Sequence, residues 1–166
     1  MRKLGSRMVK IGAAMVVGGM ALSAPVQADQ WKAVGWFGWF GVGKAMEVEK
    51  GHYYWTGEFS GSFQNDKGPG SLFHMSGVRC PAWNDLNFNT GKGSSGGYCI
   101  IRDANGDQAT LVWSIPPGPV GKAPGTFTFL SGTGKYQGIS GTYPFLGVTE
   151  VNWADGMATG YSTWNR

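Results

Sequence analysis

Large hydrophobic and small polar residues alternate along the stretch from Tyr53 to Phe63. The odd-numbered positions include four aromatic rings, at Tyr53, Trp55, Phe59 and Phe63, and the even-numbered positions carry Tyr54, Thr56, Glu58, Ser60 and Ser62. A period of two residues places alternate side chains on opposite faces of an extended chain. The pattern therefore predicts a β-strand with one aromatic face and one largely polar face.

The rest of the chain shows further extended segments separated by turns. Asn105-Gly106 stands between two apolar runs and predicts a tight hairpin, because Asn and Gly adopt the positive φ values that such turns need. The Asn- and Gly-rich stretch 81–97 predicts a long loop with a short extended piece at 85–88, and the prolines of 116–119 predict a break. The strands expected are 53–63, 71–79, 98–102, 108–113, 125–130, 136–143 and 157–164, with a further candidate at 44–49.

About eight antiparallel strands in one small domain favour closure into a barrel, since a closed sheet has no unpaired edge. We therefore predict an all-β fold, a single antiparallel and roughly eight-stranded β-barrel, with a β-sandwich as the alternative. The composition agrees with this, because the chain holds 8 Trp, 6 Tyr, 9 Phe and 29 Gly. Aromatic rings suit a pleated surface, and glycines suit its turns and bulges.

Residues 1–28 have the pattern of a cleaved secretory signal peptide. A basic start is followed by a 12-residue apolar run (11–22) and by the small-residue site Val26-Gln27-Ala28, so cleavage is expected before Asp29. The run is too short to span a bilayer, which takes about 20 residues. We expect a periplasmic or secreted protein with no transmembrane segment after cleavage.

The net charge of +4 comes from this leader, which contains Arg2, Lys3, Arg7 and Lys10 and no acidic residue. The remaining chain has as many basic as acidic side chains. It therefore lacks the excess of cations that neutralises phosphates, and nucleic acid is not expected as a partner.

Cys80 and Cys99 are the two cysteines of the chain. An oxidising compartment favours a disulfide between them, which would tie the base of the expected loop. The alternatives are two free thiols or a two-cysteine metal or redox site.

The segment 29–43 is unusually rich in aromatic rings and glycine, with Trp36, Phe37, Trp39 and Phe40 close together. Three interpretations are open: a first strand or plug of the barrel, a surface for self-association, or an interfacial membrane anchor. Burial within the chain is the default, and the barrel domain proper is expected at 44–166.

The segment from Leu130 to Tyr143 (LSGTGKYQGISGTY) resembles a corner between strands in the allene oxide cyclase and dirigent group of calycin-like β-barrels. Together with the Asp103–Asp107 hairpin, it is also similar to small secreted bacterial proteins of this barrel type. The resemblance implies an eight-stranded barrel. It transfers no catalytic residue, because members of the group differ in what they do.

The candidate reactive sites have structural explanations. Asp103, Asn105 and Asp107 begin like an EF-hand, but Ser114 stands where the twelfth ligand should be and the flanks are strands. The hairpin explains these residues, with a weak surface Ca²⁺ site in the turn as the alternative. The segment 132–135 lacks the spacer and helix of a phosphate loop. His52 and His74 are the only histidines, and the motifs of hydrolases and zinc enzymes are missing. No catalytic residue, metal or cofactor is therefore predicted.

The aromatic faces of the strands suggest an interior pocket. An eight-stranded barrel is just wide enough either to be filled by side chains or to hold one small ligand. We predict an exported β-barrel that binds a small apolar or aromatic molecule, with a packed interior, a cyclase or isomerase acting on a bound lipid, and an envelope structural protein as alternatives. The residues expected at the pocket are Tyr53, Trp55, Phe59, Phe63, Leu111, Trp113, Phe127 and Phe129, with Glu58 and His74 at its mouth.

Overall fold

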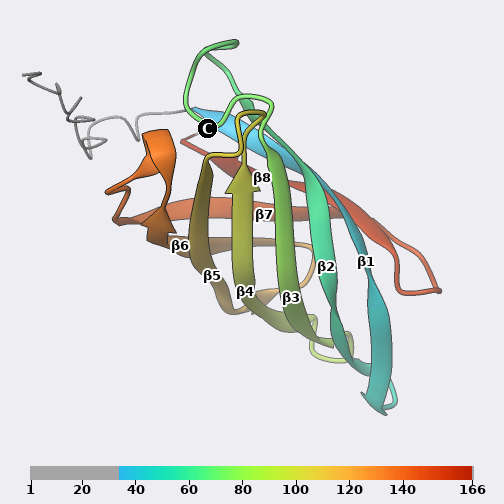
Figure 1. Cartoon of the computed structure of the whole chain (residues 1–166). Helices are drawn as coiled ribbons and strands as arrows, with labels where there is room; N and C mark the ends of the chain where they lie inside the picture. Colours follow the sequence, from blue (N-terminus) through green and yellow to red (C-terminus); the bar gives the residue numbers. More distant parts are fainter. Residues whose placement is uncertain (1–33, 166) are drawn as a thin grey trace, which may run out of the picture.

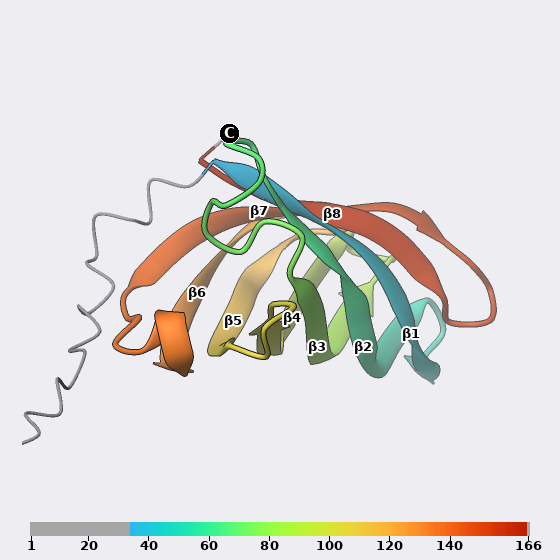
Figure 2. The same cartoon turned by 45° about the horizontal axis from the view of Figure 1, so that its top comes forward.

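The computed structural model describes residues 34–165, which form eight antiparallel strands closed into a barrel (Figures 1 and 2). Each strand pairs with the next along the chain, and β1 pairs with β8 to close the sheet. This confirms the predicted fold class. The strands are β1 (Gly35–Glu49), β2 (His52–Asn65), β3 (Gly77–Asn87), β4 (Lys92–Arg102), β5 (Gln108–Pro119), β6 (Lys122–Gly132), β7 (Thr142–Asn152) and β8 (Ala158–Trp164).

The connections divide the barrel into two ends of different character. The hairpin end carries the turns at 50–51, 88–91, 120–121 and 153–157. The loop end carries the 66–76 loop, the 103–107 turn and the 133–141 connection, which includes the short 3₁₀ helix η2 (Gly134–Tyr136). In both views the 66–76 loop lies beside the start of β1 and the carboxyl-terminal end of β8.

The aromatic segment near the amino terminus is part of the barrel. β1 begins at Gly35, pairs with β2 along its length and pairs with β8 from Gly35 to Gly41. The boundary expected at residue 44 thus falls inside a strand. Residues 1–33, including the predicted signal peptide and its cleavage site, lie outside the described residues.

The stretch 81–97 is not the predicted loop, because β3 and β4 run through most of it and meet in a hairpin at 88–91. Gly93 and Gly96 make room for large side chains, whereas Gly91, with a φ of 64°, lies in the hairpin turn. A Cβ at Gly96 would lie 3.1 Å from the ring of Trp83, so the bare backbone lets this indole lie flat across the neighbouring strand. The predicted strand 71–79 is also wrong in its first half, since residues 66–76 form the loop between β2 and β3.

The predicted break at 116–119 is absent, because β5 continues to Pro119. Proline lacks the N–H that a ladder needs and is tolerated at bulges and beside unpaired edges. The pairing of β4 with β5 shifts between Gly93 and Ser95, opposite Pro116 and Pro117. The pairing of β5 with β6 ends at Ser114, so Pro116 and Pro117 have no β6 residue to which a backbone N–H would have to donate.

Most of the predicted strand 136–143 belongs to the 133–141 connection, and only Thr142 and Tyr143 are in a strand, at the start of β7. Gly134, Gly138 and Gly141 have positive φ values, which bend the backbone at each of these positions. Tyr136 and Ile139 are consequently turned inward, and both are buried at the loop end.

The main core lies at the loop end of the barrel. Phe73, from the 66–76 loop, packs against Phe63 on β2, Phe129 on β6 and Tyr136 in η2, with ring centroids 5.9, 6.0 and 4.7 Å away. Phe73 and Tyr136 are each only 1% exposed. Side chains from two connections therefore close this end of the barrel.

The predicted disulfide is confirmed, since Cys80 and Cys99 are bonded to each other. They stand on the adjacent strands β3 and β4, and both are buried. The bridge therefore joins two neighbouring strands of the barrel wall instead of the base of a loop.

Candidate functional site

The barrel encloses a cavity of about 140 Å³ that reaches the hairpin end. Apolar and aromatic side chains form most of its wall, among them Trp39 on β1, Phe59 on β2 and Phe145 on β7. Trp39 and Phe59 are in contact, with ring centroids 4.8 Å apart. At the hairpin end the wall includes Leu86, Val120, Lys122, Thr149 and Asn152. The interior is thus closed by rings at one end and bordered by mixed polar and apolar residues at the other.

The alternation along β3 and β4 determines which residues line this cavity. Every second residue of β3 faces inward opposite an inward-facing residue of β4, and each such pair forms one row of the wall. Starting from the loop end, the rows are Val78 and Ile101, Cys80 and Cys99, Ala82 and Gly97, Asn84 and Ser95, and Leu86 and Gly93. Of these ten residues, all but Ala82 and Gly97 line the cavity. The disulfide therefore forms part of the cavity wall, and one polar row lies between it and the hairpin end.

The structure brings five of the predicted pocket residues to the cavity wall: Phe59, Phe63, Leu111, Trp113 and Phe127. Trp55 and Phe129 are buried beside this wall without lining it. The Trp55 indole N–H donates to the Gly156 carbonyl at 2.9 Å, and its ring stacks on Phe59. Tyr53 is further toward the hairpin end, edge-on to Phe88.

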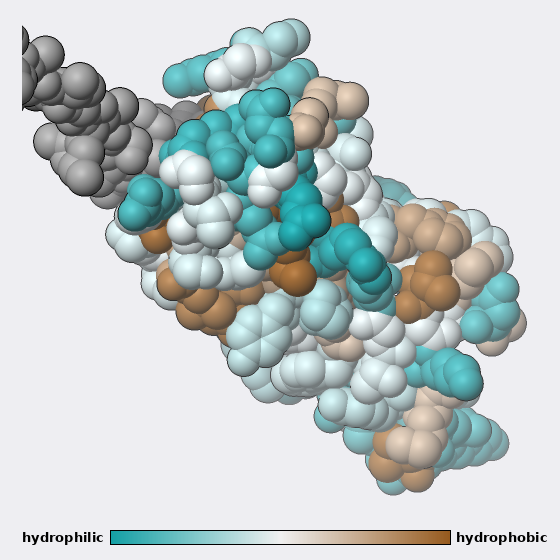
Figure 3. Space-filling model, in the orientation of Figure 1, coloured by the Kyte–Doolittle hydropathy of each residue, from teal (hydrophilic) through white to brown (hydrophobic). Residues whose placement is uncertain are grey.

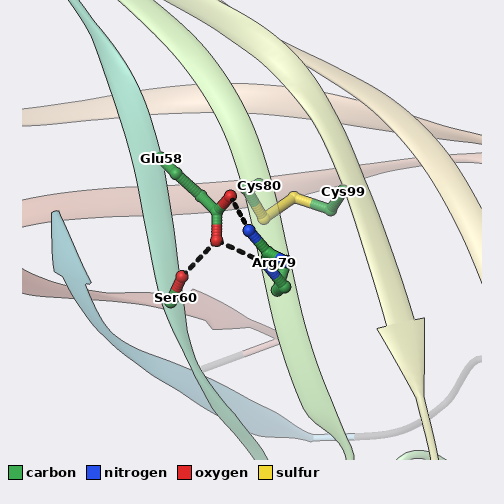
Figure 4. The surroundings of a disulfide bond; sticks show 5 residues. All are labelled: Glu58, Ser60, Arg79, Cys80 and Cys99. Atoms are coloured by element: carbon green, nitrogen blue, oxygen red, sulfur yellow. Dashed lines mark hydrogen bonds and ion pairs between the residues drawn. A yellow bond between two sulfur atoms is a disulfide. The ribbon is translucent and has the colours of Figure 1, made fainter. Parts of the chain in front are cut away.

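Glu58 does not lie at the mouth of the cavity. It is on the outer face of β2, where its two carboxylate oxygens accept hydrogen bonds from Nε and Nη2 of Arg79, both at 2.6 Å (Figure 4). Ser60 Oγ donates to the same carboxylate. The Arg79 guanidinium holds the pKa of Glu58 below its usual value. The residues described as lining the cavity include no carboxylate, so the interior carboxylate that the cyclase alternative requires is not found among them.

The two histidines are at opposite ends of the barrel. His74 belongs to the 66–76 loop, where its Nδ1 lies 3.3 Å from the backbone N of Asn65, and it does not line the cavity. His52 begins β2 at the hairpin end, and its Nε2 lies 2.5 Å from the carboxylate of Asp85. That hydrogen bond raises the pKa of His52. The two imidazoles cannot act together on one substrate.

The Asp103 turn is linked to the Gly-rich corner by an ion pair. Asp103 Oδ1 accepts the backbone N–H groups of Asn105 and Asp107, while Oδ2 pairs with Lys135 Nζ at 2.6 Å. The Lys135 ammonium lowers the pKa of Asp103. A lysine therefore stands where a cation would have to bind, and residues 34–165 hold no group of three potential metal ligands.

The aromatic residues of β1 face both sides of the barrel wall. Phe37 is 6% exposed and Trp39 lines the cavity, whereas Trp36 and Phe40 are 38% and 40% exposed on the outer face. Val42, Met46 and Val48 continue this outer row toward the hairpin end, and Trp153 lies 6.5 Å from Phe40 between ring centroids. We call these six residues the β1 stripe. In Figure 3 hydrophobic residues form separate patches on a largely polar surface, one of them at the tip where β1 turns into β2.

Comparison of the chain with protein-family models, with curated proteins and with solved structures gives no match. Within residues 34–165, no helix has the length and hydropathy needed to cross a bilayer.

Proposed function

We propose that this protein binds a small apolar or aromatic molecule inside the barrel. The observation that carries the proposal is the cavity of about 140 Å³ with a mainly aromatic and aliphatic wall. An engineered cavity of about 150 Å³ with a similar wall binds benzene in another protein. The ligand class that fits best is therefore a molecule of about one ring.

Two further features support a binding role. The rings at the loop end close one side, so a ligand entering from the hairpin end would lose most of its contact with water. Leu86, Val120 and Asn152 at the hairpin end belong to strand ends and turns, which move more readily than the sheet itself.

A variant that fills the cavity tests the proposal directly. Ala123 is 7% exposed, lines the cavity and faces inward on β6. Ala123→Phe is expected to weaken the binding of ethylbenzene by at least about tenfold, because the new ring occupies the ligand's space. Isothermal titration calorimetry measures the affinity, and Trp emission follows it independently, since Trp39, Trp113 and Trp164 line the cavity.

Thr126→Phe is the matched control, because Thr126 is exposed on the outer face of the same strand. It should leave the affinity unchanged. Saturable binding that survives in Ala123→Phe would place the ligand elsewhere. A wild-type protein that binds neither ethylbenzene nor acetophenone would refute the proposed function.

The exposed β1 stripe favours a second candidate function, assembly with another copy of the chain. Only Trp36 and Phe40 of the four rings predicted for self-association are on the outer face. Deleting the aromatic segment of β1 would open the barrel, because β1 pairs with both β2 and β8. The test therefore uses point substitutions.

Under this second proposal, the combined change Trp36→Ser and Phe40→Ser is expected to convert a dimer into a monomer in sedimentation velocity at micromolar concentration. Tyr98→Ser removes an exposed ring from β4, 58% exposed, and serves as the control. A wild-type protein that sediments as a monomer over this range would argue against assembly through β1.

A further inference from the structure

One row of the cavity wall is polar. Asn84 on β3 stands opposite Ser95 on β4, and both line the cavity. On the neighbouring strands their register partners are Trp55 and Ile115, so apolar side chains flank the pair on both sides. The row toward the loop end carries only Ala82 and Gly97.

This polar pair is partly shielded from solvent. In the next row toward the hairpin end, a Cβ at Gly93 would lie 2.8 Å from Leu86 Cδ2 and 3.5 Å from Val120 Cγ2. Leu86 and Val120 therefore converge over Gly93, and Asn84 and Ser95 are both half-buried one row inside the mouth.

Neither polar side chain makes a hydrogen bond to any residue of the described part of the chain. By contrast, the side chain of Asn65, which is buried at the loop end, donates to the Leu72 carbonyl at 3.0 Å. Water can reach half-buried polar groups such as these, and a ligand that displaces this water has to satisfy them in its place. Their placement on the cavity wall is what a site for a polar group of a ligand requires.

The hydrogen-bonding capacity of the pair and the charge of the cavity wall together indicate what that group is. The Asn84 amide N–H and the Ser95 hydroxyl can both donate to one oxygen atom. Among the described cavity-lining residues the single charged one is Lys122, a cation, and there is no carboxylate. The wall therefore favours an oxygen acceptor and disfavours a cationic ligand.

We propose that the ligand carries a carbonyl or carboxylate oxygen next to its apolar body, and that Asn84 and Ser95 bind this oxygen. The inference rests on the proposed function and specifies its ligand class. It makes Asn84 and Ser95 specificity-determining residues of the cavity.

The test is a comparison of two ligands of nearly the same shape, acetophenone and ethylbenzene, of which only the first has the oxygen. Asn84→Leu, which keeps the side-chain size, and Ser95→Ala are each expected to weaken acetophenone binding by about fivefold, the effect of one lost hydrogen bond. Ethylbenzene binding should change by less than about twofold, since it never used the polar groups. Comparing each ligand with itself across variants removes their difference in hydrophobicity.

Ser94→Ala is the control, because Ser94 is the neighbour of Ser95 and faces outward. Thermal unfolding followed by circular dichroism shows whether each variant folds. If Asn84→Leu does not fold, the comparison of the two ligands in Ser95→Ala is the test. Equal effects on the two ligands in the folded variants would overturn the inference and leave the proposed function standing. If neither ligand binds to the unaltered protein, the proposed function and the inference both fail.

Discussion

Replacing Phe73 by alanine is expected to lower the free energy of unfolding by about 3–5 kcal/mol, the usual cost of truncating a fully buried Phe. Phe73 is 1% exposed and packs against Phe63, Phe129 and Tyr136. These rings come from β2, β6 and η2, so the truncation leaves a void among three separate elements. Such a site collapses poorly, which puts the cost toward the upper part of the range.

Urea unfolding followed by circular dichroism measures this loss. Phe88→Ala is the matched control, since Phe88 stands in a connection at the other end, is 52% exposed and packs on Tyr53. Its cost should stay within about 0.5 kcal/mol. Similar losses for the two variants would show that Phe73 does not close the loop end.

The backbone at Phe73 explains why the sequence did not reveal this role. Phe73 has φ 59° and Met75 has φ 58°, a region that bulky residues rarely enter. The cost of such a conformation is on the order of 1–3 kcal/mol, and burying the Phe ring contributes about as much in the opposite direction. Tertiary packing thus supports a local conformation that no sequence pattern indicates, and the residues around Phe73 resembled a strand.

The sequence was enough to predict which side chains face the interior, but not where each of them lies along the barrel axis. A period of two was enough to place Phe59, Phe63, Leu111 and Phe127 on the inner face. Whether an inward ring reaches the cavity depends on the stagger of the strands and on what closes each end. Phe129 is covered by the 66–76 loop, whose contacts are long-range and leave no local signal.

Asn84 and Ser95 were missed for a different reason. The many Asn and Gly residues of 81–97 are typical of loops, and this composition masked the alternation of β3 and β4. One signal was available in the sequence. If Cys80 and Cys99 are opposite each other on two antiparallel strands, a residue after Cys80 faces the residue that is equally far before Cys99. Asn84 is four residues after Cys80 and Ser95 is four residues before Cys99, so the two face each other.

Removing the disulfide with Cys80→Ala and Cys99→Ala is expected to lower the free energy of unfolding by about 3 kcal/mol. The bridge closes a loop with a sequence separation of 19 residues, so the unfolded chain gains conformational freedom when it is lost. The folded barrel should persist, because the ladder between β3 and β4 continues on both sides of the bridge.

Chemical unfolding of the double variant, and of the wild-type protein with and without a reductant, separates the sources of this loss. An effect on the unfolded chain should appear to a similar extent in the reduced protein and in the double variant. A much larger loss in the double variant would instead point to the packing of the two sulfur atoms, since both cysteines line the cavity wall. Under the proposed function, saturating ethylbenzene should raise the stability of each form by an amount set by its affinity for that form, and a form with a distorted wall would gain less.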